Sequence, residues 1–247
     1  MTASALPAHP PSAASSVLAE VRNHIGHLTL NRPAGHNAID LSMVRSLQAQ
    51  LNAWALDETV YAVVLRGAGD KAFCAGGDIR SLYDSHQTGQ TLHQDFFAEE
   101  YALDLSIHRY RKPVLALMDG FVLGGGMGLV QGADLRVVTE RSRLGMPEVA
   151  IGYFPDVGGS YFLPRIPGEL GVYLGVTGVQ IGAATQTISA SLADGTLASL
   201  LDVDIGSPIL RVSRTVFDVA HRPVQHVFAQ FRPDRYQIKL DLQSARA

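Results

Sequence analysis

Apolar and polar positions alternate at the start of the patterned part of the chain. Residues 17–23 and 27–33 both alternate, with Gly26 between them, so we expect a β-hairpin. Asp40 then precedes a segment whose apolar residues recur at helical spacing and predict an amphipathic helix capped by Asp40. These apolar residues are Leu41, Val44, Leu47, Leu51 and Trp54.

Continuous apolar runs follow at residues 60–65 and 113–120, and both are typical of buried strands. Residues 93–111 are compatible with a helix. A glycine-rich turn at 121–132 leads into another helix, and residues 135–140 read as a short strand. The repeated order of strand, glycine turn, helix and strand predicts an α/β fold built on parallel strands.

The two ends of the chain differ from this middle part. Residues 1–16 are rich in Ala, Ser and Pro and contain no Lys or Arg, so we expect a disordered tail. From about Gly178 the periodicity weakens: residues 181–201 suggest one or two weak helices, and residues 202–247 show no clean period. We therefore expect a tail at 1–16, a folded core at 17–178 and a region of uncertain structure at 179–247.

Composition narrows the class of protein. The chain has 247 residues, of which 47% are hydrophobic and 17% charged, enough apolar material for a core. A net charge of -3 without a basic run argues against nucleic-acid binding, and no apolar run has the ~20 residues that would cross a membrane. The lack of a recognisable secretory or transit signal leads us to expect a cytoplasmic protein.

Several catalytic classes find no support in the sequence. The nine histidines show no metal-binding spacing, and Ser160 does not lie in a GxSxG motif. Cys74 is the only cysteine and has no evident base beside it, so we interpret it as a small apolar filler. We expect neither a metal site nor a Ser or Cys nucleophile.

The segment 146–164 carries the most informative chemistry. Glu148 and Asp156 lie eight residues apart among apolar residues, glycines and prolines. Poor solvation raises the pKa of a carboxyl group, so we predict an acid/base or nucleophile/base pair that faces one pocket. Taken singly, Glu148 could be a solvated loop acid and Asp156 could cap a helix that starts at Val157.

Two glycine-rich loops could supply backbone donors. Gly76 and Gly77 leave N–H groups that can stabilise a developing oxyanion, although the loop could equally be a strand-to-helix turn capped by Asp78. Residues 124–128 open a helix and could supply a second donor or only allow close helix packing; their GGGMG spacing does not match a dinucleotide fingerprint. Glu99 and Glu100 lie on a helix flank, where acids usually face solvent.

Together, four ordered segments resemble the crotonase (enoyl-CoA hydratase/isomerase) superfamily, and within it the 3-hydroxyisobutyryl-CoA hydrolases. The segments are LNRPAGHNAI, GAGDKAFCAGGDIR, GGGMGL and MPEVAIGYFPDVGGSYFLPR. The resemblance covers residues 17–178. It implies an α/β spiral of ββα units that binds acyl-CoA, followed by a C-terminal region that is truncated or diverged.

The resemblance also implies roles for individual residues. The backbone N–H groups of Gly77 and Gly125 would form the oxyanion hole, and Glu148 and Asp156 would be catalytic. Gly128 stands where hydratases of the superfamily carry a glutamate, so their two-glutamate mechanism is not available here. The residues implied to contact substrate are Ala75, Asp78, Glu100, Gly125, Glu148 and Asp156.

The activity implied is hydrolysis of a short 3-hydroxyacyl-CoA, such as 3-hydroxyisobutyryl-CoA to 3-hydroxyisobutyrate and CoA in valine degradation. CoA is part of the substrate, so we expect no separate cofactor. The alternatives are a hydratase or isomerase activity, or an inactive CoA-binding relative whose site is poorly covered. The expected partner is the acyl-CoA itself, without nucleic acid or membrane, and a homo-oligomer is compatible with the sequence.

Overall fold

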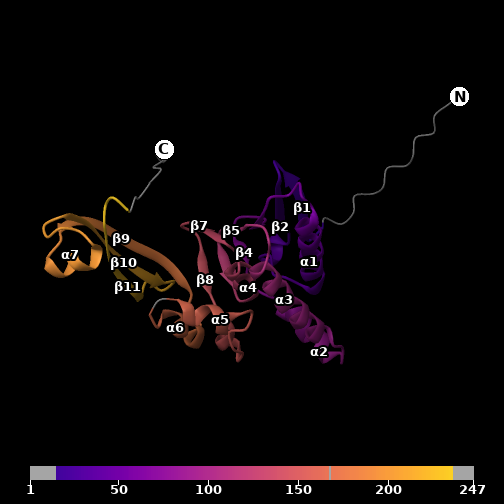
Figure 1. Cartoon of the computed structure of the whole chain (residues 1–247). Coiled ribbons are helices and arrows are strands. Elements are labelled where there is room, and N and C mark those ends of the chain that lie inside the picture. The colour runs from indigo at the N-terminus through magenta and orange to yellow at the C-terminus, as the bar shows by residue number, and fades with distance from the viewer. Residues whose placement is uncertain (1–14, 167, 236–247) are drawn as a thin grey trace, which may run out of the picture. The chain divides into compact units, whose positions relative to one another are not determined.

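The computed structural model describes residues 15–166 and 168–235, and the chain divides into two compact units between Ile181 and Gly182. Figure 1 labels most of the helices and strands of both units. The first unit contains all the segments that carry the candidate chemistry. The predicted tail at 1–14 lies outside the described residues, whereas Ser15 and Ser16 accept hydrogen bonds from Asn31.

The first unit is built on two sheets. In one sheet, β1 (Val17–Arg22) pairs antiparallel with β2 (Ile25–Leu30), and β3 (Ala62–Gly67), β5 (Val114–Met118) and β7 (Leu135–Val138) extend it in parallel. The second contains the parallel strands β4 (Ala72–Cys74), β6 (Phe121–Leu123) and β8 (Arg143–Gly145). The pairs β3–β4, β5–β6 and β7–β8 each send one strand to each sheet, and helical segments follow each pair. This is the expected spiral of ββα units.

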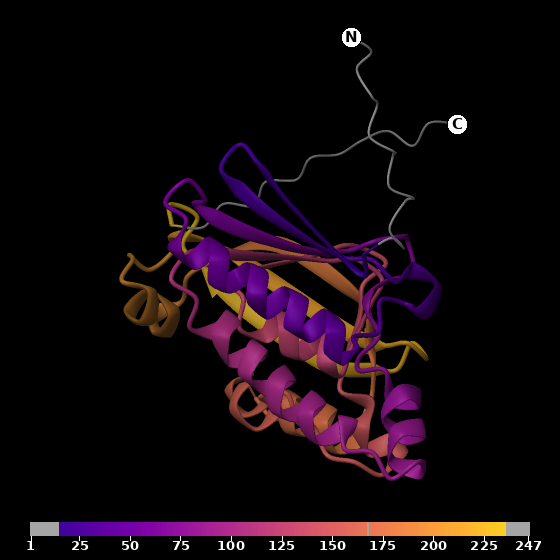
Figure 2. The same ribbon diagram turned by 90° about the vertical axis from the view of Figure 1, so that its right-hand side faces the viewer.

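Helices fill the connections. They are α1 (Leu41–Leu56), α2 (Ile79–Gln87), α3 (Leu92–His108), α4 (Gly125–Gln131), α5 (Gly159–Phe162) and α6 (Leu170–Thr177), with 3-10 turns at Pro33–Gly35, Pro147–Ile151 and Leu163–Arg165. Asp40 caps α1 as predicted, because its side chain accepts a hydrogen bond from Met43 N–H. Figure 2 shows α1 and α3 side by side, and their buried faces share one apolar core with the strands.

The predicted hairpin forms, but Gly26 is not its turn. Asn23 and His24 make the turn with positive φ angles of 49° and 65°, the geometry of tight hairpins. Gly26 lies within β2, where a Cβ atom would come 2.5 Å from the ring of Trp54. The glycine therefore leaves space for the indole ring of Trp54 on α1. Asn23 and His24 are the residues that reverse the chain.

The second unit differs from its prediction. Residues 181–192 form the strand β9 (Ile181–Leu192) rather than a helix, while α7 (Gly195–Leu201) confirms a helix in the second half of that region. β10 (Pro208–Asp218) and β11 (Pro223–Phe231) pair antiparallel in a region whose sequence shows no clean period. Thr185, Thr187 and Ile188 are β-branched and favour the extended state.

No helix in the ranges 15–166 and 168–235 is long and apolar enough to cross a membrane. Residues 236–247, which belong to the predicted uncertain region, lie outside the described part of the chain.

Candidate active site

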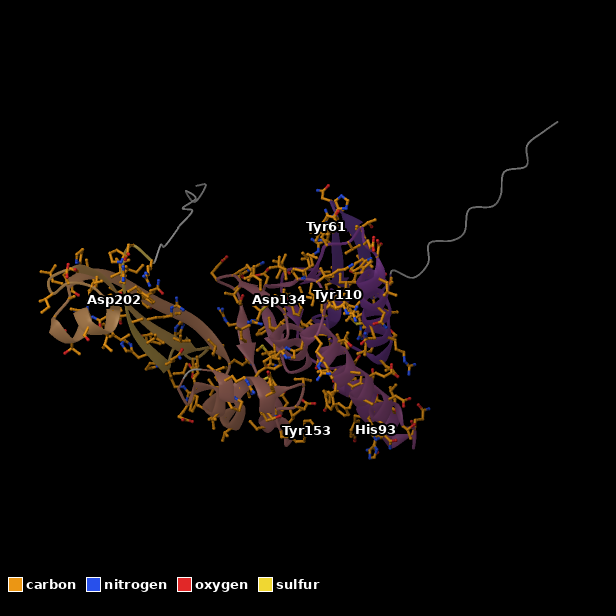
Figure 3. The ribbon with its side chains drawn as sticks, viewed as in Figure 1. Tyr61, His93, Tyr110, Asp134, Tyr153 and Asp202 are labelled. Carbon is orange, nitrogen blue, oxygen red and sulfur yellow. The ribbon has the colours of Figure 1, made fainter. Side chains whose placement is uncertain are left out.

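A cavity of about 390 Å³ gathers the candidate residues of the first unit. Both glycine-rich loops and the Pro147–Ile151 turn line it, together with one face of α3. Tyr153, labelled in Figure 3, also lines the cavity, and its ring lies over that of Phe97 at a centroid distance of 6.1 Å. The candidate residues that line it are Ala75, Gly77, Glu100, Gly125, Glu148 and Asp156.

The loop that carries Gly77 is held by the segment before α1. Ile39 N–H donates to the carbonyl of Gly76 at 2.9 Å, and Asp78 N–H donates to the carbonyl of Ile39 at 2.8 Å. Gly77 thus sits in a short parallel bridge with Ile39, and among the described residues its own N–H has no backbone acceptor. The N–H group stays available at the cavity wall.

Asp78 has a structural task beside that loop. Its carboxylate caps α2 through Ser81 N–H and accepts from Arg32 at 2.9 Å. Burial would raise its pKa, but the hydrogen bonds from Arg32 and Ser81 outweigh burial and hold the pKa below its usual value. Asp78 is not among the residues that line the cavity. The capping interpretation is confirmed, and its contact with CoA stays a prediction.

Gly125 brings a second N–H group to the same place. It is the first residue of α4, where a backbone N–H has no acceptor within its own helix. A Cβ atom on Gly125 would come 3.3 Å from the backbone nitrogen of Gly77, so the two amides are near neighbours. Gly124 before it has a φ of +50° and a Cβ there would lie 2.8 Å from Oε1 of Glu148. These glycines let backbone and carboxyl groups approach closely.

Glu148 is buried in the Pro147–Ile151 turn, with 7% of its surface exposed. Its Oε2 atom has no hydrogen-bond partner among the described residues. Burial, with a smaller contribution from Asp156, raises the pKa of Glu148 to about 7. The predicted rise is confirmed for this residue, so its carboxyl group can exchange a proton near neutral pH.

Asp156 lines the same cavity and does not cap a helix. Helix α5 begins at Gly159 with Gly158 at its cap, so the capping interpretation of Asp156 is wrong. Its Oδ2 atom instead accepts a 2.5 Å hydrogen bond from the hydroxyl of Tyr101. The structure thus brings Glu148 and Asp156 to one pocket; their catalytic roles stay predictions.

Helix α3 adds two buried acids, one of which the sequence analysis missed. Glu99 pairs with Arg45 near the surface, but Glu100 is 2% exposed, and burial raises its pKa to about 8. Asp104, one turn further on, is 9% exposed. Its position four residues after Glu100, on the helix face that also buries Phe96, was the signal that could have identified it.

Cys74 is fully buried, and burial raises the pKa of its thiol to about 12, so it packs as an apolar filler as predicted. Within the described part of the chain, no group of three or more His, Cys, Asp or Glu side chains could hold a metal ion.

Spiral ββα units and an acid-lined cavity with two neighbouring glycine amides define a protein of the crotonase class. The chain belongs to the enoyl-CoA hydratase/isomerase family, whose pattern it matches over residues 25–241. This match extends well beyond Gly178, the last residue of the resemblance expected from the sequence motifs.

Curated relatives and solved structures agree with this family. A protein of Xenopus tropicalis named as a mitochondrial 3-hydroxyisobutyryl-CoA hydrolase is 52% identical over 156 residues, which make up 63% of this chain and 40% of that protein. A rat protein of the same name is 50% identical over 68% of this chain and 43% of its own length. The chain therefore matches less than half the length of these relatives.

The names of both relatives place them in mitochondria. The cytoplasmic location expected for this chain stays a prediction.

Among solved structures, a carnitinyl-CoA dehydratase from Mycobacterium thermoresistibile is 43% identical with a TM-score of 0.66, covering 68% of this chain and 49% of that one. An enoyl-CoA hydratase from Rhodobacter sphaeroides is 44% identical with the same TM-score, covering 68% of this chain and 50% of that one. These likenesses support the crotonase fold over about two thirds of the chain.

Proposed function

We propose that this protein hydrolyses a short 3-hydroxyacyl-CoA thioester, with 3-hydroxyisobutyryl-CoA as the substrate. One observation carries the proposal. Glu148 and Asp156 line the same cavity as the neighbouring amides of Gly77 and Gly125. The names of the curated relatives support this substrate. Gly128 supports hydrolysis over hydration, because it offers no second carboxyl group at that point of α4.

The reaction uses water and releases two products. The N–H groups of Gly77 and Gly125 bind the thioester oxygen and stabilise its negative charge as the carbonyl carbon is attacked. Glu148, as a carboxylate, drives the attack either by bonding to that carbon itself or by taking a proton from water. The carbon–sulfur bond breaks, the thiolate of CoA takes up the proton that water loses, and the oxygen of that water becomes the second oxygen of the acid. Where Glu148 itself bonds to the carbon, water then cleaves the resulting anhydride and restores the carboxylate of Glu148. Asp156 positions the water or the substrate hydroxyl.

A thiol-release assay with 3-hydroxyisobutyryl-CoA tests the proposal. We expect the unaltered protein to release CoA and Glu148→Gln to lose at least 100-fold in rate, since an amide is neither a base nor a comparable nucleophile. Glu58→Gln is the matched control, because Glu58 is exposed and is not among the residues lining the cavity. Its rate should equal that of the unaltered protein.

Hydration of crotonyl-CoA, measured in parallel, separates the competing activity. Hydration without CoA release would contradict the hydrolase and favour a hydratase. Binding of CoA without turnover of either substrate would identify a CoA-binding relative without catalytic activity.

A further inference from the structure

Two carboxyl groups on α3 face two glycines on α4. Glu100 lies against Gly125, and Asp104 lies against Gly128, where a Cβ atom would come 2.5 Å from Oδ2 of the aspartate. Each pair is about one helical turn from the other along its helix. The acids of α3 therefore occupy the space that side chains on α4 would take.

Asp104 is the member of this arrangement without an assigned task. Both of its carboxyl oxygens are buried, and neither has a hydrogen-bond partner among the described residues. A buried polar group without a hydrogen-bond partner is destabilising, so its presence calls for a ligand or a water molecule that completes it. Burial, and then the charges of Glu100 and Asp156, raise the pKa of Asp104 well above its usual value.

The surroundings of Asp104 connect it to the candidate active site. It lines a second cavity of about 610 Å³, and Asp156 lines both this cavity and the one that holds Glu148. Along α3, Asp104 lies about 6 Å beyond Glu100, which is next to Gly125. A short acyl group whose carbonyl contacts the amides of Gly77 and Gly125 and whose far end reaches Asp156 would come to the cavity that Asp104 lines.

We propose that Asp104, and not Asp156, recognises the 3-hydroxyl group of the acyl chain and so selects hydroxylated substrates, which leaves Asp156 to position the water. This inference rests on the proposed function, because it takes the acyl-CoA from there. A hydroxyl group both donates and accepts, so it suits a carboxyl group in either protonation state. Gly128 contributes to the same recognition site, because a side chain at that position would displace the carboxyl group of Asp104.

Binding of two stable CoA analogues by calorimetry tests the inference without requiring turnover. In both, a methylene group replaces the thioester sulfur; one carries the 3-hydroxyisobutyryl group and the other the isobutyryl group, which lacks the hydroxyl. We expect the unaltered full chain to bind the hydroxylated analogue about tenfold more tightly. Equal affinities, or no binding of either analogue, would overturn the inference without any variant.

Variants then assign the preference to Asp104. Asp104→Leu should remove the tenfold preference and change the affinity for the isobutyryl analogue less than twofold, whereas Asp95→Asn, an exposed acid on the same helix, should keep the preference. If the preference survives in a folded Asp104→Leu protein, another residue recognises the hydroxyl and the inference is wrong.

CoA release, measured separately, distinguishes the two proposals. Hydrolysis without a preference in binding contradicts only the role of Asp104. A preference in binding without hydrolysis contradicts only the proposed hydrolase activity.

Discussion

The hydroxyl of Tyr101 donates a 2.5 Å hydrogen bond to Oδ2 of Asp156, and this bond ties α3 to the loop that carries the acid. Asp156 is half-buried and lines two cavities, and the hydrogen bond from Tyr101 orients its carboxyl group between them. Burial, followed by the hydrogen bond to Asp156, raises the pKa of Tyr101. The phenol therefore remains a donor at neutral pH and holds one oxygen of the carboxylate.

Tyr101→Phe should slow CoA release and also lower the free energy of unfolding. Loss of the donor frees Asp156, and we expect kcat to fall about tenfold while the free energy of unfolding falls by about 1 kcal/mol. Urea unfolding and thiol release measure the two quantities. Tyr83→Phe, an exposed tyrosine on α2, is the control and should change neither. An unchanged kcat in Tyr101→Phe would show that this bond does not position a catalytic group.

Much of the first unit could be predicted from the sequence because local patterns decide its elements. The helical spacing before Trp54 and the apolar runs of β3 and β5 match the structure, apart from shifts at their ends. Strand β9 could not be predicted in this way. Its residues are mostly exposed, so they carry no two-residue alternation between a core face and a solvent face.

The candidate site was predictable only where a motif lies in one continuous segment. Glu148 and Asp156 share such a segment, and the structure places both at one cavity. Asp104 was missed because acids on a helix usually face solvent. Its burial depends on Gly128 of another helix, whose missing side chain leaves space for the carboxyl group. The packing of one helix against another cannot be read from the apolar periodicity of either helix.

The stability of the protein should fall as the pH rises from 5 to 9. Glu148 and Glu100 each have a usual pKa of 4.5, and in the folded protein the values rise to about 7 and about 8. The folded state therefore binds these protons more tightly than the unfolded chain, and the stabilisation is full below about pH 4.5 and is lost as the pH passes 7 to 8. Glu148→Gln should reduce this loss by roughly 3 kcal/mol.

Urea unfolding at pH 5 and pH 9 measures the effect, with Glu58→Gln as the control that keeps the full pH dependence. If Glu148→Gln and the unaltered protein lose the same free energy between the two values, Glu148 does not carry a raised pKa.

Gly128→Ala should destabilise the protein although alanine favours a helix by about 1 kcal/mol over glycine. The new methyl group would lie 2.5 Å from Oδ2 of Asp104 and 2.8 Å from Cβ of Val157, and overpacking of this kind costs about 1–3 kcal/mol. In an Asp104→Ala background the cost should shrink, because one of the two clashes is gone. Gly35→Ala is the control, since no atom lies within 4 Å of a Cβ there. Additive effects of Gly128→Ala and Asp104→Ala in urea unfolding would contradict this packing.

Arg32 should help to position the amide of Gly77, although Arg32 is not among the residues that line the cavity. Its guanidinium group donates to Asp78 at 2.9 Å, lies 3.2 Å from Asp40 and donates to the carbonyl of Ala38 at 2.8 Å, so it fastens the loop of residues 75–78 to the start of α1. Arg32→Ala should lower the free energy of unfolding at pH 7 by about 1–2 kcal/mol and reduce kcat. Arg32→Lys should restore only part of both, because an ammonium group cannot reach all three acceptors.

The pH dependence of the Arg32 effect separates its ion pair from simple packing. The hydrogen bond from Arg32 helps to keep the pKa of Asp78 below 3.8, so this contribution is present above that pH and is lost as the pH falls through the lowered pKa. The stability gap between Arg32→Ala and the unaltered protein should therefore narrow from pH 7 to pH 3 in urea unfolding. Arg22→Ala removes an exposed pair with Glu20 and should cost less than about 0.5 kcal/mol at either pH. A gap that stays constant would mean that Arg32 acts through its packed side chain and not through Asp78.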